Sequence, residues 1–268
     1  MITILRLGSV VRHGVGGPEA GSMDLIYTFL LKEFEQDVYS YIGINQIDDE
    51  LEELIMKESG NRIFVNIRYP IYKDFENKSV GEKNKIRLDV IHTALSRIAE
   101  YENKLSLKKL EKIRDEILKK DFLFDFVYKT CISKKTNSRV AKIVVRPEMK
   151  QFKISILIEE KGKEKCNVPI FMGIPNSSYM DKYFFYGKWN DSKFIVWGKD
   201  KTVETHISVD TCKIDIVNLT PYDNPPYYTM MKVGLTNEEK EKATKDWHHS
   251  MSPTHAAIIR QHLGGASN

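Results

Sequence analysis

The chain carries one set of charged residues whose types and spacing suit metal-dependent chemistry. Glu159 and Lys161 are separated by one residue in the segment ILIEEK, and Glu148 follows a proline upstream. Two carboxylates can hold a divalent metal ion, and a neighbouring lysine can help to activate the attacking water. Glu148, Glu159 and Lys161 are therefore candidate catalytic residues.

This acid-x-lysine spacing resembles the strand-borne half-motif of restriction-endonuclease-like nucleases. The resemblance implies a metal-dependent nuclease. The stretch 129–165 supports it, because eleven Lys or Arg against four Glu suit a phosphate backbone, with or without cleavage. The sequence EEKGKEK is also typical of a charged, solvent-exposed hairpin turn, so both interpretations remain open.

A second set follows the expected first strand, where Arg12-His13-Gly14 resembles the RHG signature of histidine phosphatases. The resemblance implies that His13 is phosphorylated and that Arg12 holds the phosphate. That family also needs a second histidine near a strand end, whereas His206 lies in the middle of an expected strand. The alternative is a glycine-rich loop that turns the chain, and the segment GVGGPEAGS lacks the lysine of a P-loop.

Histidines gather near the C-terminus, where four of the seven fall in the last 21 residues. These are His248, His249, His255 and His262. A zinc site would need several of these side chains to converge, whereas adjacent histidines point to different helix faces. The two interpretations are a zinc site and a polar helical tail. We expect no metal and no cofactor. The cysteines are widely spaced and fit no ligand pattern, so we expect buried thiols at Cys131, Cys166 and Cys212.

Aromatic and lysine residues crowd the region between 179 and 199. Tyrosine and tryptophan are common at protein interfaces, and aromatic rings also stack on single-stranded bases. Strand alternation buries about half of such side chains, so core packing alone is the other interpretation. The candidate binding residues are Lys182, Tyr186, Lys188, Trp189, Lys193 and Trp197.

Two helices are the clearest elements predicted to position these groups. Ser79 and Glu82 form a capping box, and apolar residues then recur at helical spacing. The stripe contains Ile86, Val90, Ile91, Ala94, Leu95 and Ile98. A second helix is expected to begin at Ser106, and the short link 102–105 favours an antiparallel helical hairpin that covers a sheet.

The elements before this hairpin predict an α/β part. Residues 2–7 predict a first strand. A helix is expected from Ser22 through LIYTFLLKEFEQ, although its aromatics also allow a strand. Asp48 and Asp49 are expected to cap a short acidic helix that carries Leu51, Leu54 and Ile55 and ends at Gly60-Asn61, and residues 62–69 predict a strand.

After residue 121 the apolar period falls to two, from Phe122 and Phe124 onward to Ile216. Prolines end this region, and helices are expected over 236–249 and 252–262. We predict an α+β fold. It comprises an N-terminal α/β part with a helical hairpin (1–120), a mainly antiparallel β-meander (121–234) and a short helical tail (235–268), fused into one globule.

Charge is divided unevenly along the chain. Residues 1–60 have a net charge of −7, and the remainder carries +11. Such a division predicts that the two parts attract each other or attract different partners.

Without a signal-like or membrane-spanning segment, we expect a cytoplasmic location and no membrane contact. The leading interpretation is a non-enzymatic protein that binds another protein, such as a toxin-neutralising immunity protein or a small subunit of a defence complex.

Overall fold

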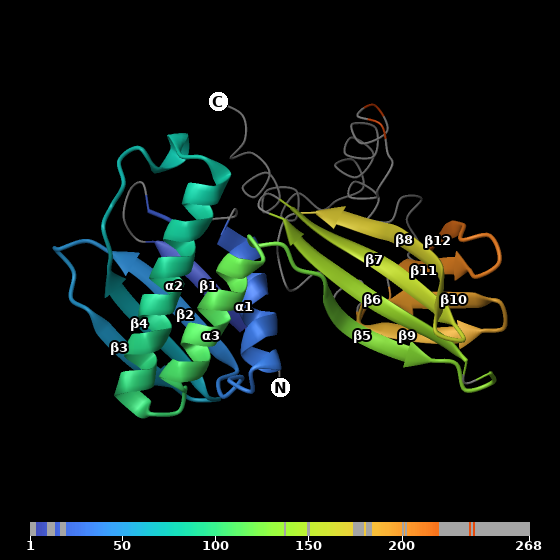
Figure 1. Ribbon diagram of the computed structural model, residues 1–268, viewed down its shortest axis with the longest axis horizontal. Coiled ribbons are helices and arrows are strands. Elements are labelled where there is room, and N and C mark those ends of the chain that lie inside the picture. The colour runs from blue at the N-terminus through green and yellow to red at the C-terminus, as the bar shows by residue number, and fades with distance from the viewer. Residues whose placement is uncertain are drawn as a thin grey trace. The chain divides into compact units, whose positions relative to one another are not determined.

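The computed structural model describes residues 4–9, 14–16, 20–136, 138–148, 151–173, 180, 184–199, 201, 203–219, 236 and 238. The chain forms two compact units. Unit 1 contains residues 1–128 with 144–153 and 173–178, and unit 2 contains 129–143, 154–172 and 179–268. Helices accompany a sheet in unit 1, and antiparallel meanders follow, so the fold is α+β as predicted (Figure 1).

The sheet of unit 1 is mixed. Its strands are β1 (Ile4–Ser9), β2 (Tyr41–Ile47), β3 (Leu54–Glu58) and β4 (Arg62–Arg68). They are arranged in the order β1-β2-β4-β3, with β1, β2 and β4 parallel and β3 antiparallel to β4. The two strands predicted near residues 2–7 and 62–69 are confirmed.

The predicted helix from Asp48 to Gly60 is wrong. Residues 48–53 form a loop, and Leu54–Glu58 are the edge strand β3. The guanidinium of Arg68 donates to the Leu51 carbonyl oxygen at 2.9 Å, and the Arg68 backbone N–H donates to the Glu53 carboxylate at 2.9 Å. Pairing with β4 thus satisfies the backbone, and it outweighs a weak helical preference.

Three helices lie over one face of this sheet (Figure 1). They are α1 (Gly21–Glu33), α2 (Val80–Glu102) and α3 (Leu107–Lys119), and a short 3-10 turn η2 (Phe75–Asn77) precedes α2. The capping box of Ser79 and Glu82 is present, and the predicted helical hairpin is confirmed. The α2 stripe from Val90 to Ile98 is fully buried, although Ile86 is half-buried.

The chain leaves α3 through a tight turn rather than directly into a strand. Asp121 and Phe122 both have left-handed backbones, with φ of 47° and 62°. The Phe122 N–H donates to the Ile117 carbonyl oxygen at 3.1 Å, which closes the helix end. The alternation that starts at Phe122 therefore does not begin a strand, and β5 starts at Phe126.

Two four-stranded sheets make up the rest of the described chain. One contains β5 (Phe126–Ile132), β6 (Arg139–Glu148), β7 (Gln151–Glu160) and β8 (Lys163–Gly173). The other contains β9 (Tyr186–Asn190), β10 (Lys193–Trp197), β11 (Val203–Ser208) and β12 (Ile214–Asn218). Each sheet follows chain order, so the predicted meander is confirmed.

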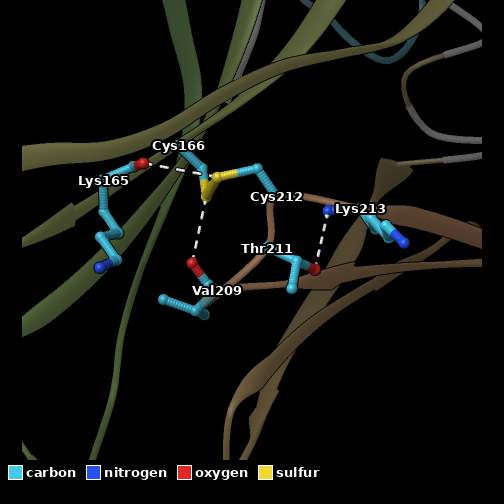
Figure 2. The surroundings of a disulfide bond; sticks show 6 residues. All are labelled: Lys165, Cys166, Val209, Thr211, Cys212 and Lys213. Atoms are coloured by element: carbon cyan, nitrogen blue, oxygen red, sulfur yellow. Dashed lines mark hydrogen bonds between the residues drawn. A yellow bond between two sulfur atoms is a disulfide. The ribbon is translucent and has the colours of Figure 1, made fainter.

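A disulfide joins β8 to the turn between β11 and β12, contrary to the expectation of buried thiols (Figure 2). Cys166 and Cys212 are 46 residues apart in sequence, and their Cα atoms are 5.6 Å apart. Each sulfur lies 3.4 Å from a backbone carbonyl oxygen, those of Val209 and Lys165 respectively. Cys131 is a free, half-buried thiol, and burial raises its pKa.

Within the described residues, no helix is both long enough and apolar enough to cross a membrane. The predicted C-terminal helices over 236–249 and 252–262 fall outside the described residues, apart from positions 236 and 238.

Candidate functional site

A groove of about 670 Å³ opens in unit 2 between the edges of the two sheets. One wall consists of residues 131–136 with Arg139, from the end of β5 and the turn that follows. The other wall consists of residues 187–191, from β9 and the start of its turn. Both β5 and β9 are terminal strands in their sheets. Its volume falls within the range of roughly 300–1,000 Å³ that is common for ligand sites.

Side chains, rather than a backbone ladder, connect the two walls. The Trp189 indole Nε1 donates to the Cys131 carbonyl oxygen at 3.0 Å. Next to this bond, Lys135 forms an ion pair with Asp191 at 2.9 Å. Lys129 donates to the Phe185 carbonyl oxygen at 2.6 Å, just beyond the groove. These bridges hold the edges of β5 and β9 close to each other.

The predicted aromatic and lysine residues divide between two faces of β9 and β10. The pairing of Tyr186 with Trp197 places Tyr186, Lys188, Lys193 and Trp197 on one face. Trp189 lies on the opposite face, where its ring packs 5.1 Å from that of buried Phe194. Trp189 therefore combines a core contact with a place in the groove wall.

On the first of these faces, Tyr186, Trp197 and Lys188 form one stack. The rings of Tyr186 and Trp197 are 5.5 Å apart and nearly parallel, and the Lys188 ammonium lies 5.1 Å from the Trp197 ring centre. Tyr186 is 39% exposed. Ordered aromatic rings with a cation above them offer a binding surface that loses little side-chain entropy on contact. Lys182 lies outside the described residues.

The groove has an excess of positive charge. Lys134 is exposed and has no ion-pair partner among the described residues, and Lys188 contacts an aromatic ring rather than an acid. The Lys135–Asp191 pair is 79% and 76% exposed, so water screens it and its hold is weak. Arg139 is partly neutralised by Glu160 at 2.7 Å. The balance favours an acidic ligand.

The wider basic stretch 129–165 has less free charge than its composition suggests. Six of its eleven basic side chains have polar partners within the described residues. The pairs are Lys129 with the Phe185 carbonyl, Lys135–Asp191, Arg139–Glu160, Lys142–Glu159, Arg146–Asp125 and Lys153–Glu148. Many of these basic side chains therefore already have a polar partner within the protein, which lowers the positive charge available to a ligand.

The nuclease candidates do not meet. Glu148 ends β6 and pairs with Lys153 at 2.6 Å, whereas Glu159 lies at the far end of β7 and pairs with Lys142 at 2.7 Å. The eight residue-to-residue steps from the start of β7 to Glu159 span roughly 25 Å of extended strand. Lys161 is a turn residue with φ of 52°, followed by Gly162 with φ of 75°, a pattern typical of a tight hairpin turn.

Arg12 and His13 lie outside the described residues. The next part of their loop is fastened from both sides. The Val15 N–H donates to the Gln46 side-chain oxygen at 2.8 Å, and the buried Arg87 donates to the Val15 carbonyl oxygen at 3.1 Å. His206 lies within β11 and contacts Glu204 at 2.8 Å.

Among the described residues, no three His, Cys, Asp or Glu side chains converge as a metal site requires. The four C-terminal histidines are outside that part of the chain. The groove itself was not predictable as a unit. Turn-forming residues near 135–137 and the aromatic segment near 189 were separate signals, and neither indicates that the two segments become neighbours.

Comparison with known proteins adds no family to this geometry: no protein-family model, no curated protein and no solved structure matches the chain.

Proposed function

We propose that this chain is a non-enzymatic binding protein that docks another protein through the groove of unit 2. The observation that supports the proposal is the groove between two strand edges, which is lined by Lys134, Lys188 and Trp189. Exposed strand edges offer backbone groups to a partner, and the lysines would select an acidic one.

A protein partner fits this site better than a nucleic acid. Trp189 has its ring against Phe194 and its indole nitrogen on a carbonyl, and Tyr186 and Trp197 stack on each other. Base stacking on these rings would need them to part. Paired lysines such as Lys142 also reduce the charge available to a phosphate backbone.

Capture of partners from the native host tests the proposal. Tagged wild-type protein is compared with a groove variant, Lys134→Glu/Lys188→Glu, and with a control of equal charge change on α3, Lys108→Glu/Lys112→Glu. We expect the same protein to accompany wild type and control, and its recovery to fall about tenfold or more with the groove variant. Equal recovery with all three would contradict the proposal.

Two further outcomes identify the alternative functions. Recovery of nucleic acid that depends on Lys134 and Lys188 would indicate a nucleic-acid-binding protein. Cleavage of DNA or RNA in Mg²⁺ or Mn²⁺ that is lost in Glu159→Ala would indicate a nuclease. The nature of the captured protein distinguishes the two finer possibilities. Capture of a toxin would indicate an immunity protein, and capture of components of a defence complex would indicate a subunit of that complex.

The location also belongs to this proposal. Disulfides persist in oxidising compartments and are rare in the cytosol. The Cys166–Cys212 bond therefore favours an oxidising compartment over the cytoplasmic location expected from sequence. Trapping free thiols with an alkylating agent in intact cells tests this location. We expect the agent to label Cys131 but not Cys166 or Cys212. Labelling of all three cysteines would instead favour the cytoplasm.

A further inference from the structure

Unit 1 presents an acidic segment, residues 48–54, with the sequence DDELEEL. Asp49, Glu50 and Glu52 are exposed, and their side chains have no ion-pair partner among the described residues. Leu51 and Leu54 are 46% and 54% exposed in the same segment. Exposed leucines between free carboxylates form a surface that is both anionic and apolar.

The acidic segment has a fixed shape although it lies on the surface. Arg68 anchors it twice, through the Leu51 carbonyl oxygen and the Glu53 carboxylate. The Glu50 N–H donates to the Asp48 carboxylate at 3.1 Å. The segment then continues into β3, an edge strand. A surface ordered in advance loses less conformational entropy when it binds.

The groove of unit 2 has complementary properties. Its free or weakly held cations are Lys134, Lys135 and Lys188, and the exposed side chain of Ile132 gives it an apolar contact point. Three unpaired carboxylates on the one surface thus match, in number and opposite sign, three ammonium groups on the other, of which Lys135 is held only by an exposed ion pair. Both elements end in edge strands, β3 in one case and β5 with β9 in the other.

We infer that the acidic segment of one copy docks into the groove of a second copy. This inference rests on the groove being a binding site, as proposed above, and it names a second copy of this chain as an occupant. Because the two surfaces differ, the contact is head-to-tail, and each added copy leaves one groove and one acidic segment free. Association therefore grows with concentration and weakens with salt, because salt screens exposed charges.

Sedimentation equilibrium of the full chain at low and high salt tests this inference. Two variants remove charge from one surface each: Asp49→Asn/Glu50→Gln/Glu52→Gln and Lys134→Gln/Lys135→Gln/Lys188→Gln. The control, Lys108→Gln/Lys112→Gln/Lys119→Gln, changes three exposed lysines of α3. We expect wild type and control to exceed the monomer mass at low salt and each surface variant to remain monomeric.

Mixing the two surface variants gives the decisive result. One retains a basic groove and the other retains an acidic segment, so an equal mixture should form a 1:1 dimer, which is twice the monomer mass and cannot grow further. A wild type that is monomeric throughout the dilution series, or surface variants that associate like wild type, would overturn the inference. If wild type is monomeric and the foreign partner still needs the groove, the proposed function stands and this inference fails.

Discussion

Unit 1 and unit 2 differ in the elements that cover and connect their sheets. Unit 1 covers one face with helices, and the α2 residues from Val90 to Ile98 bury a continuous apolar stripe. Unit 2 has no long helix in its described part, and its sheets are connected by the Cys166–Cys212 bond and the Trp189 bridge. Unit 2 also buries apolar side chains, such as Ile156, Phe194 and Ile207, but it adds these cross-links between its strands. The comparison indicates that unit 1 relies mainly on apolar burial, whereas cross-links add to it in unit 2.

The two units also provide separate optical signals for testing this comparison. Both tryptophans among the described residues, Trp189 and Trp197, belong to unit 2, whereas α1, α2 and α3 belong to unit 1. Tryptophan fluorescence therefore reports unfolding of unit 2, and helical circular dichroism reports unfolding of unit 1.

The largest expected effect is a cavity in unit 1. Leu95 is fully buried, so Leu95→Ala should lower the free energy of unfolding by about 2–5 kcal/mol. The loss should appear in the helical signal during urea unfolding and leave the tryptophan transition in place. Leu107→Ala, at a position 46% exposed on α3, is the matched control. A shift of equal size in both signals would show that the units unfold together.

The cross-link of unit 2 should give the next largest effect. Cys212→Ser removes a bond that closes a long loop, so the tryptophan transition should lose about 2–4 kcal/mol. The same loss should follow when wild type is reduced. Cys131→Ser keeps the bond and serves as the control. If reduction leaves the wild-type transition unchanged, the contrast between the units does not hold.

A smaller, pH-dependent effect is expected in unit 1, at Asp24. Burial raises the pKa of this carboxyl from 3.8 to about 8, while its oxygen accepts the Leu7 N–H at 3.1 Å. The folded state therefore keeps a proton that the unfolded state has lost, and the free energy of unfolding falls as pH rises through this window. Asp24→Asn should flatten that slope in urea unfolding followed by circular dichroism. An unchanged slope would show that Asp24 is not its source.

The smallest expected effect concerns the bridge across the groove. Trp189→Phe keeps an aromatic ring against Phe194 but loses the hydrogen bond to Cys131, so unit 2 should lose about 1 kcal/mol. Circular dichroism in the β-sheet region measures this loss without using tryptophan fluorescence, which the substitution itself changes. Trp197→Phe, which changes an indole on the other face, is the control. A similar loss of stability in both variants would show that the hydrogen bond from Trp189 to Cys131 does not contribute more than an indole on the other face.

Local signals in the sequence predicted the elements whose stability is local. The Ser79–Glu82 capping box and the apolar stripe of α2 lie within a few helical turns, and both are present. The segment from Asp48 to Gly60 was predicted as a helix because its acids suit a first turn. Its conformation depends on Arg68 and on pairing with β4, which are distant contacts. The strand β2 was not predicted, because Gly43 and Asn45 interrupt its apolar pattern.

The site depends still more on distant contacts. Tyr186, Lys188 and Trp197 were predicted as binding residues from their types, but their division from Trp189 follows from strand register. The disulfide brings together residues 46 positions apart, which spacing alone does not indicate. The groove wall at 131–136 was missed for the same reason, since only the folded sheets bring it to β9.

Amide hydrogen exchange of the chain with and without its captured partner tests the central claim most directly. The account predicts slower exchange at residues 187–191 and 133–136, the two groove walls, and unchanged exchange in the middle of α2. Protection confined to unit 1, with residues 187–191 exchanging as in the free protein, would contradict it.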